Sequence, residues 1–487
     1  MAQPSIRKNL AYSTVYEILL IITPLITAPY VSRVLGADGV GIQSYTASIA
    51  YYFQLFAVWG RSSYGRREIA QHRDSKQEYS KLFWEIELMS VVTSCASLFL
   101  WAILIFLSAD YRIYFIALTP NILGTMFDIV WFYNGLEKFK LTVMRDSFFK
   151  VFSIVLLFLF VKDENDVVIY IWILSLTTLI SALSLWTYLP KVLVKVNFRE
   201  LRIKRHFKQT FVYFIPKIAT SIYTMLDKTL IGVITQDTSQ NGYYEQAEKV
   251  INLAKNTSST AVNSVMEPRN SYLFAEKKYD EIHHLIQESM NFILFMSVGC
   301  CFGIWGIAVN FVPVFFGEGY DPVVSLLYIF APIVIAIGIS SCLEAQYYTP
   351  SGHRAQTAKY TMCGAGINLV LNLIMIPRLG AIGAAIASLI AQSCIAVLDI
   401  ANSQKFMTGK LLLQLAWKKL TAGAIMSVLV YFTGMVTFLP GLVTVILQVF
   451  VGILVYVVLL FVLHDAWVLE QAGKAFEKLK NRQKKEK

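Results

Sequence analysis

Runs of about 20 apolar residues recur along the whole of this 487-residue chain, and they constrain its fold more than any other feature. An α-helix needs a segment of that length and composition to cross a lipid bilayer. Only 15% of the residues are charged, against roughly 25% in a soluble domain. We therefore expect an all-α polytopic membrane protein rather than a string of soluble domains.

Windows of about 19 residues place about 14 transmembrane helices in the sequence. The eighth span contains several charged residues, and it is included because the flanking loops alternate in charge only if it crosses the membrane. The predicted limits are 9–34, 38–60, 82–108, 111–135, 145–162, 167–190, 210–236, 242–266, 287–314, 321–347, 357–377, 380–406, 413–438 and 441–464.

The distribution of Lys and Arg orients these spans. With the N-terminus inside, about 35 of the 43 cationic residues fall on or beside inside segments, which predicts that both termini are cytoplasmic. The net charge of +11 then reflects topology and attraction to anionic membrane lipid, so it requires no nucleic acid as a partner. The predicted outside loops are short and leave no extracytoplasmic domain for soluble chemistry.

A basic amphipathic connector, residues 191–209, divides the predicted helices into two lobes. The N-lobe is 1–190 with spans one to six, and the C-lobe is 210–407 with spans seven to twelve. Spans thirteen and fourteen occupy 408–466, and a basic cytoplasmic tail occupies 467–487. Tight outside turns at 34–39 and 233–238 hold equivalent places in the two lobes, which is typical of a six-plus-six repeat.

Charged residues inside the spans indicate where function lies, because each costs about 2.5 to 3.5 kcal/mol on insertion scales. Lys217 and Lys228 share one face of the seventh span with Ser221 and Thr224. The eighth span carries a polar stripe as well, and exposing the four lysines of both spans to lipid would cost on the order of 10 kcal/mol. We hypothesise that these faces line a water-filled cavity that receives an anion. The eighth-span residues are Tyr244, Glu248, Lys249, Asn252, Lys255 and Ser259.

A purely structural alternative stays open for these lysines. Asp227, Glu245 and Glu248 could neutralise them in ion pairs that only hold the second lobe together. Lys217 favours the cavity, because no acidic residue lies within one turn of it. It is also close enough to the inner surface to extend its amine to water.

Other polar residues and two prolines complete the set of candidates. Pro24 and Pro29 predict a kink in the first span, which could act as a gate or hinge. Arg33 near the outer end of that span is a candidate for ligand contact or for snorkelling to the interface. The candidates for cavity polarity or for H+ or Na+ coupling are Glu17, Asp128, Asp227, Glu248 and Asp399.

Motifs for catalysis and for cofactor binding are missing from the sequence. It contains no phosphate-binding loop, dinucleotide fingerprint, zinc-protease motif or nucleophile elbow. The six cysteines and six histidines have no metal-ligand spacing within the spans. We expect a protein that is not an enzyme and holds no metal or organic cofactor. Uphill transport would draw on an H+ or Na+ gradient or on substrate flux.

Three motifs in the first lobe resemble those of bacterial polysaccharide repeat-unit flippases, which carry lipid-linked oligosaccharides. These flippases belong to the multidrug/oligosaccharidyl-lipid/polysaccharide exporter superfamily. The resemblance covers the whole first lobe, and it extends to the second lobe mainly by topology. The motifs are PLITAPYVSRVLGADGVG at 24–41, YGRREIA at 64–70 and WFYNGLEKFK at 131–140.

The resemblance implies a function in polysaccharide export. It implies fourteen helices that carry an undecaprenyl-diphosphate-linked oligosaccharide from the inner to the outer leaflet of the bacterial cytoplasmic membrane by alternating access. The product would be capsule, O-antigen or a similar polymer, with a polysaccharide polymerase as a further partner. Several relatives spread cavity arginines over both lobes, whereas the deep cations predicted here are lysines in the second lobe.

Two alternatives to a flippase remain open at this point. An ion-coupled multidrug antiporter of the same superfamily should line its cavity with net negative charge, and the second-lobe lysines count against it. A membrane enzyme that polymerises lipid-linked sugars would need catalytic groups on the outside, where the predicted loops are short.

Overall fold

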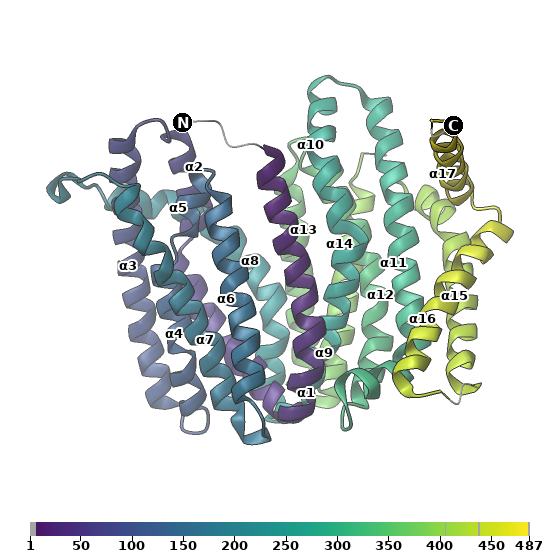
Figure 1. Ribbon diagram of the computed structural model, residues 1–487, viewed down its shortest axis with the longest axis horizontal. Helices are drawn as coiled ribbons and strands as arrows, with labels where there is room; N and C mark the ends of the chain where they lie inside the picture. Colours follow the sequence, from purple (N-terminus) through teal and green to yellow (C-terminus); the bar gives the residue numbers. More distant parts are fainter. Residues whose placement is uncertain (1–5, 405, 437–438, 486–487) are drawn as a thin grey trace. The chain divides into compact units, whose positions relative to one another are not determined.

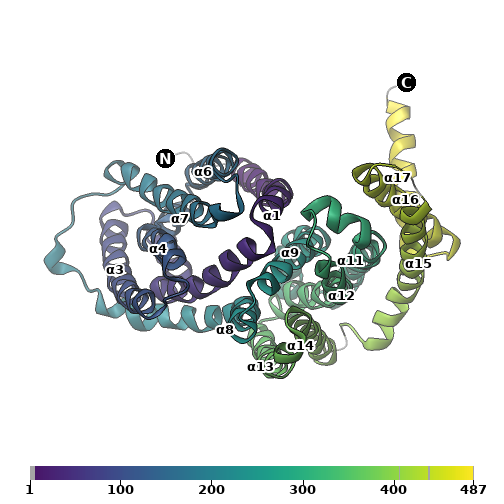
Figure 2. The same cartoon turned by 90° about the horizontal axis from the view of Figure 1, so that it is seen from below.

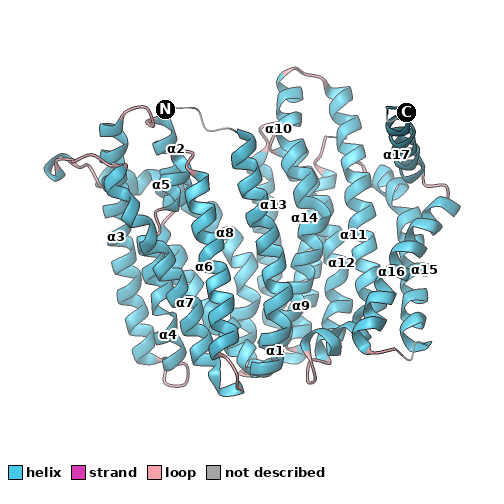
Figure 3. Cartoon of the chain, viewed as in Figure 1, coloured by secondary structure: helices cyan, strands magenta, loops and turns pink. Residues whose placement is uncertain are grey.

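The computed structural model describes residues 6–404, 406–436 and 439–485. Side chains of residues 6–17, 216, 219, 220, 222, 223, 261, 475, 476 and 478–485 lie outside that description. The described elements are helices joined mostly by short loops (Figure 3). Ten candidate membrane spans lie within the described part of the chain, so this is an all-helical, multi-pass membrane protein. The count of fourteen spans and the cytoplasmic location of both termini stay predictions.

The chain divides into two compact units, Met1–Glu245 and Gln246–Lys487. The boundary between them falls inside helix α9 (Thr238–Lys255). The first unit therefore contains α8 (Lys204–Thr235) in addition to the segments before the basic connector. The predicted limits of the two lobes stay a prediction.

The first unit opens with α1 (Ile6–Val58), a helix long enough to cover both of the first two predicted spans. Gly36 has φ 66° and ψ 179°, which places the change of direction within the tight turn expected from the sequence. The helix assignment continues through Pro24 and Pro29, and non-helical backbone angles within α1 occur at Gly36. The role of the two prolines as a gate or hinge stays a prediction.

Shorter helices pack around α1 in this unit. Figure 2 shows α4 between α3 and α7, and α4 contacts α7, α3 and α1. Apolar side chains from these helices, including Trp101, Phe115 and Ile122, are almost fully buried between them. The helices are α2 (Arg61–Gln71), α3 (Lys76–Leu107), α4 (Arg112–Phe127), α5 (Val130–Gly135), α6 (Phe139–Phe160) and α7 (Val167–Ser184).

The connector between α7 and α8 contains two short 3-10 turns, Leu185–Lys191 and Phe198–Glu200. It is the teal loop that extends past α3 in Figure 1. Tyr79 on α3 donates a hydrogen bond to the Val192 carbonyl (3.0 Å), and the Ser80 hydroxyl accepts one from the Val194 N–H (3.1 Å). These contacts anchor the connector to α3.

The second unit has a core built on α11 (Tyr279–Phe316), which packs against α12 and α15. The helices α13 and α14 pack closely on either side of the turn after Pro377. Gly383 permits this contact, because a Cβ at that position would lie 2.7 Å from the Met375 carbonyl oxygen. Two π-helical turns, Asn256–Thr260 and Glu344–Tyr348, interrupt the regular helices. The other helices are α10 (Ala261–Ala275), α12 (Pro322–Leu343), α13 (Arg354–Leu379), α14 (Ala381–Ala401), α15 (Gly409–Val436), α16 (Gly441–Val462) and α17 (Ala466–Lys485).

Candidate functional site

A break in the fourth predicted span is the starting point of the candidate site. α4 ends at Phe127 and α5 begins at Val130, so Asp128 and Ile129 interrupt the helix. Asp128 has an extended backbone (φ −74°, ψ 106°), and its carboxylate accepts a hydrogen bond from the Val130 N–H (3.1 Å). Broken helices are tolerated at membrane depth where other groups satisfy the freed backbone atoms, and in transporters they often mark binding sites.

The Arg61 guanidinium satisfies the carbonyl groups that this break releases. It donates to the Thr125 oxygen (2.7 Å) and to the Met126 oxygen (3.3 Å). The Arg61 side chain also forms an ion pair with Glu87 (3.2 Å), and both side chains are at most 2% exposed. An ion pair this deeply buried holds α2, α3 and the end of α4 together, and removing one partner would leave the other charge uncompensated.

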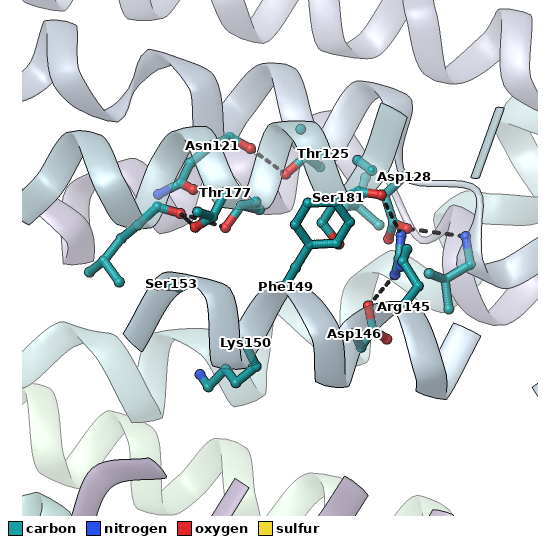
Figure 4. A pocket seen from close by; sticks show the side chains of 16 residues that line it. Asn121, Thr125, Asp128, Arg145, Asp146, Phe149, Lys150, Ser153, Thr177 and Ser181 are labelled. Carbon is teal, nitrogen blue, oxygen red and sulfur yellow. Dashed lines mark hydrogen bonds and ion pairs between the residues drawn. The ribbon is translucent and has the colours of Figure 1, made fainter. Parts of the chain in front are cut away.

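A polar pocket of about 530 Å³ opens between α4, α6 and α7, beside the break. Figure 4 shows Asn121, Ser153 and Thr177 toward one end of it, and Asp128, Arg145 and Asp146 toward the other. The pocket is lined by two cationic and two acidic side chains, which gives it no net charge.

Arg145 and Asp146 neutralise each other at one end of the pocket. Their side chains form an ion pair, and the Arg145 guanidinium also donates to the Ser181 carbonyl oxygen (2.9 Å) on α7. The Arg145 side chain is 11% exposed. The bond to Ser181 fixes α6 against α7.

Lys150 is the second cation of the pocket. It is half-buried on α6, and Figure 4 shows its amine apart from the Arg145–Asp146 pair. Among the residues that the structure describes, no carboxylate forms an ion pair with it. Lys150 lies about 17 Å along the helix axis from the start of α6.

A second charged cluster lies where α1 meets α8 and the beginning of α9. Lys228 and Glu245 form an ion pair of 2.7 Å, and the Ser44 hydroxyl donates to the same carboxylate (2.8 Å). Tyr244 donates a hydrogen bond to the Asp227 carboxylate, which is 3% exposed. A cavity of about 220 Å³ adjoins this cluster.

The two tight turns that hold equivalent places in the predicted repeat lie in contact. The Asp38 carboxylate accepts hydrogen bonds from the hydroxyls of Thr238 (2.7 Å) and Ser239 (2.8 Å). Two glycines allow the backbones to touch: a Cβ on Gly41 would lie 1.7 Å from the Thr238 oxygen, and one on Gly242 would lie 2.0 Å from the Ala37 oxygen. The predicted orientation places this contact at the outer surface.

The predicted lysines occupy different environments. Lys228 is buried and paired with Glu245, which is the arrangement that the ion-pair hypothesis expects, while Lys217 on the same helix is exposed. Lys249 and Lys255 are half-buried and belong to the second unit. Their contact with an anion stays a prediction.

The remaining candidates are scattered within the two units. Arg33 is exposed, and Asp128 borders the polar pocket. Glu248 is half-buried in the second unit, where Asp399 is buried and its main-chain oxygen accepts a hydrogen bond from Tyr348 (2.7 Å). The side chain of Glu17 lies outside the described residues.

Sequence reasoning missed Arg61, Arg145 and Lys150 as charges buried or half-buried within the first unit. The expectation that deep cations concentrate in the second lobe is therefore incomplete, because Arg61 is buried and Arg145 and Lys150 are half-buried in the first. Three charges within six residues of the mainly apolar helix α6 form a signal in the sequence that could have identified the pocket.

The chain is similar in sequence to known proteins. Residues 6–274 match the family described as "Polysaccharide biosynthesis protein". A protein of Escherichia coli (strain K12) named as an O-antigen transporter is 24% identical over 398 residues, which cover 80% of this chain and 94% of that protein. A protein of Haloferax volcanii named as a low-salt glycan biosynthesis flippase is 25% identical over 268 residues, or 54% of this chain and 55% of that protein.

Solved structures share the fold. The lipid II flippase MurJ in an inward closed conformation has a TM-score of 0.75 at 17% identity, covering 94% of this chain and all of that one. An inward-facing multidrug resistance transporter of the MATE family in the MOP superfamily has a TM-score of 0.56 at 11% identity, covering 79% of this chain and 97% of that one. At these identities the likeness establishes the fold alone.

Proposed function

The chain belongs to the polysaccharide biosynthesis protein family, and from this premise we propose that it translocates undecaprenyl-diphosphate-linked oligosaccharide repeat units across the membrane. The direction is from the inner to the outer leaflet of the bacterial cytoplasmic membrane, by alternating access. The relatives named as an O-antigen transporter and a glycan biosynthesis flippase support a lipid-linked oligosaccharide as the cargo. The product would be capsule, O-antigen or a similar envelope polymer.

The observation that carries this proposal is the charged pocket beside the broken α4–α5 helix. Each ionised group within a bilayer costs about 2.5 to 3.5 kcal/mol of insertion free energy. The first lobe holds Arg145, Asp146 and Lys150 around a cavity in spite of this cost. A diphosphate and its sugars lose their water on entering a membrane and need polar groups in exchange. A pocket of this kind supplies them.

The individual roles follow from charge and position. Lys150 is the first-unit cation that we propose meets the anionic headgroup, because the described residues give it no ion pair. The predicted lysines would add to it from α8 and α9, and a proton or sodium ion would drive the cycle through a carboxylate. The proposed cations are Lys217, Lys228, Lys249, Lys255 and Arg33, and the proposed coupling residues are Glu17, Asp128, Asp227, Glu248 and Asp399.

The relatives are named as transporters and flippases, which supports a role that is not enzymatic. A polysaccharide polymerase would then receive the repeat unit on the outer side. The multidrug antiporter of the same superfamily is the second candidate, since a MATE structure shares the fold. Such an antiporter binds cationic drugs and needs surplus negative charge, whereas the charges around the first-unit pocket balance.

Genetic complementation tests the proposal. In a strain that lacks its own flippase and makes a matching repeat unit, wild type should restore surface polysaccharide. The Lys150→Gln variant and the Lys217→Gln, Lys228→Gln variant should not restore it at equal expression, because the diphosphate loses its counter-charges. Wild type that fails to restore polymer but confers drug resistance would favour the antiporter instead.

A further inference from the structure

A third cavity lies at the end of α6 that the predicted orientation places at the inner membrane surface. It has a volume of about 630 Å³ and lies between the first half of α6 and the 3-10 turn Leu185–Lys191. Tyr188, Phe148 and Met144 border it and are 44 to 63% exposed, so the cavity opens on the surface of the lobe. It is separate from the polar pocket except at Arg145 and Phe149, which border both.

The charge around this cavity is one-sided. Lys138, Lys140 and Arg145 border it, and no acidic residue does. The nearest carboxylate in sequence, Glu137, is engaged by Arg73 in an ion pair of 2.6 Å. In the described part of the chain neither lysine forms an ion pair, whereas Arg145 is already paired with Asp146. Two lysine amines are thus available to an anion.

Burial and a neighbouring charge act on one of these lysines. Lys138 precedes the first turn of α6, and partial burial together with the positive charge of Lys76 lowers its pKa. An anion placed beside Lys138 would stabilise its protonated amine and so oppose the lowering of the pKa. The N-terminus of α6 adds the positive end of the helix dipole to the same place.

An exposed apolar strip continues from the lysines toward the middle of the membrane. Lys140, Met144, Phe148 and Phe152 recur every four residues and so share one face of α6. The Phe148 and Phe152 rings stack with centroids 6.1 Å apart, and both side chains are exposed. The strip extends about 18 Å along the helix, more than half of the hydrocarbon core.

From this arrangement we propose that the Lys138–Lys140 cavity binds the phosphate headgroup of a lipid in the adjacent leaflet, whose chain lies along Met144, Phe148 and Phe152. The amines hold the phosphate by charge-assisted hydrogen bonds. Basic pockets at the ends of transmembrane helices bind anionic lipid headgroups in the same way. This binding site is independent of the proposed transport activity, and its test needs no turnover.

Two kinds of lipid share the required chemistry, and the experiment separates them. Purified full-length protein is titrated with phosphatidylglycerol, with undecaprenyl phosphate and with zwitterionic phosphatidylcholine, and bound lipid is counted by native mass spectrometry. We compare wild type with the Lys138→Gln, Lys140→Gln variant. The matched control is Lys191→Gln, Lys195→Gln, which removes two exposed cations of the connector that do not border the cavity.

The cavity variant should raise the Kd for an anionic lipid by about tenfold or more, and the control should leave it unchanged. Loss of both anionic lipids would identify a general phosphate site, and loss of undecaprenyl phosphate alone would identify a site for the carrier lipid. Equal weakening by the control, or no change in the cavity variant, would overturn the proposal. A Lys138→Arg, Lys140→Arg variant should retain binding, which separates loss of charge from misfolding.

Discussion

Arg61 and Glu87 form an ion pair of 3.2 Å, almost fully withdrawn from solvent, at the point where α4 stops being helical. The same guanidinium donates hydrogen bonds to the Thr125 and Met126 carbonyl groups at the break. Together with the Trp186 indole N–H, which donates to the Phe127 carbonyl oxygen (2.8 Å), this side chain stabilises the irregular backbone that borders the polar pocket.

Replacing Arg61 by Ala should destabilise the protein by about 3 to 5 kcal/mol, because Glu87 would stay buried without its cation. Denaturant unfolding of the purified protein in detergent measures this change. The matched control is Arg66→Ala, an exposed arginine on the same helix, which should change the free energy of unfolding by less than about 0.5 kcal/mol. Equal stability of the two variants would contradict the capping role of Arg61.

Lys150→Met should lower transport at least about tenfold while leaving the melting temperature unchanged or higher, because the variant no longer buries a charge that costs about 2.5 to 3.5 kcal/mol. Transport is scored by surface polysaccharide at equal expression. Lys162→Met serves as the control, since Lys162 is exposed just beyond the end of α6. Normal transport by Lys150→Met would remove this lysine from the headgroup site.

Lys228→Gln should reduce both stability and transport, because it leaves the Glu245 charge without its partner at 2.7 Å. The Lys228→Gln, Glu245→Gln variant distinguishes the two hypotheses for this lysine. We expect it to regain the thermal stability of wild type without regaining transport. If it also transports normally, the pair serves only to hold α8 against α9.

The contact between Asp38 and Ser239 should be open to chemical cross-linking, since their side-chain oxygens are 2.8 Å apart. In a background from which the six natural cysteines have been removed, an Asp38→Cys, Ser239→Cys pair should form a disulfide on oxidation. If the two turns separate during transport, the oxidised protein stops and the reduced protein resumes. An oxidised protein that transports as fast as the reduced one would show that the turns stay together.

The helical fold and the turn at Gly36 could be predicted from the sequence, because apolar runs and a Gly-Ala-Asp-Gly turn are local signals. The break at Asp128 could not. Phe127 and Ile129 flank it with apolar side chains, and neither glycine nor proline marks the place. The group that stabilises this break is distant in sequence, since the Arg61 side chain donates hydrogen bonds to the carbonyl groups of Thr125 and Met126.

The candidate site shows the same division between local and distant causes. The lysine stripe on α8 follows from helical spacing, and the sequence does predict Lys228 as a buried cation. Its pairing with Glu245 depends on how α9 folds back after Gln236, which no spacing rule specifies. The sequence shows the charges on α6, but apolar residues surround them, so they were not predicted to line a cavity.

Gly41 and Gly242 are far apart in the chain, yet the space that a side chain on either would need is occupied by the backbone of the opposite turn. In a library that samples every amino acid at every position, substitutions at these two glycines should have similar effects. A methyl group at either residue would separate the same pair of backbones, so the phenotypes should match in kind, and combining them should add little. Epistasis between two glycines would then report whether these turns touch in the living cell.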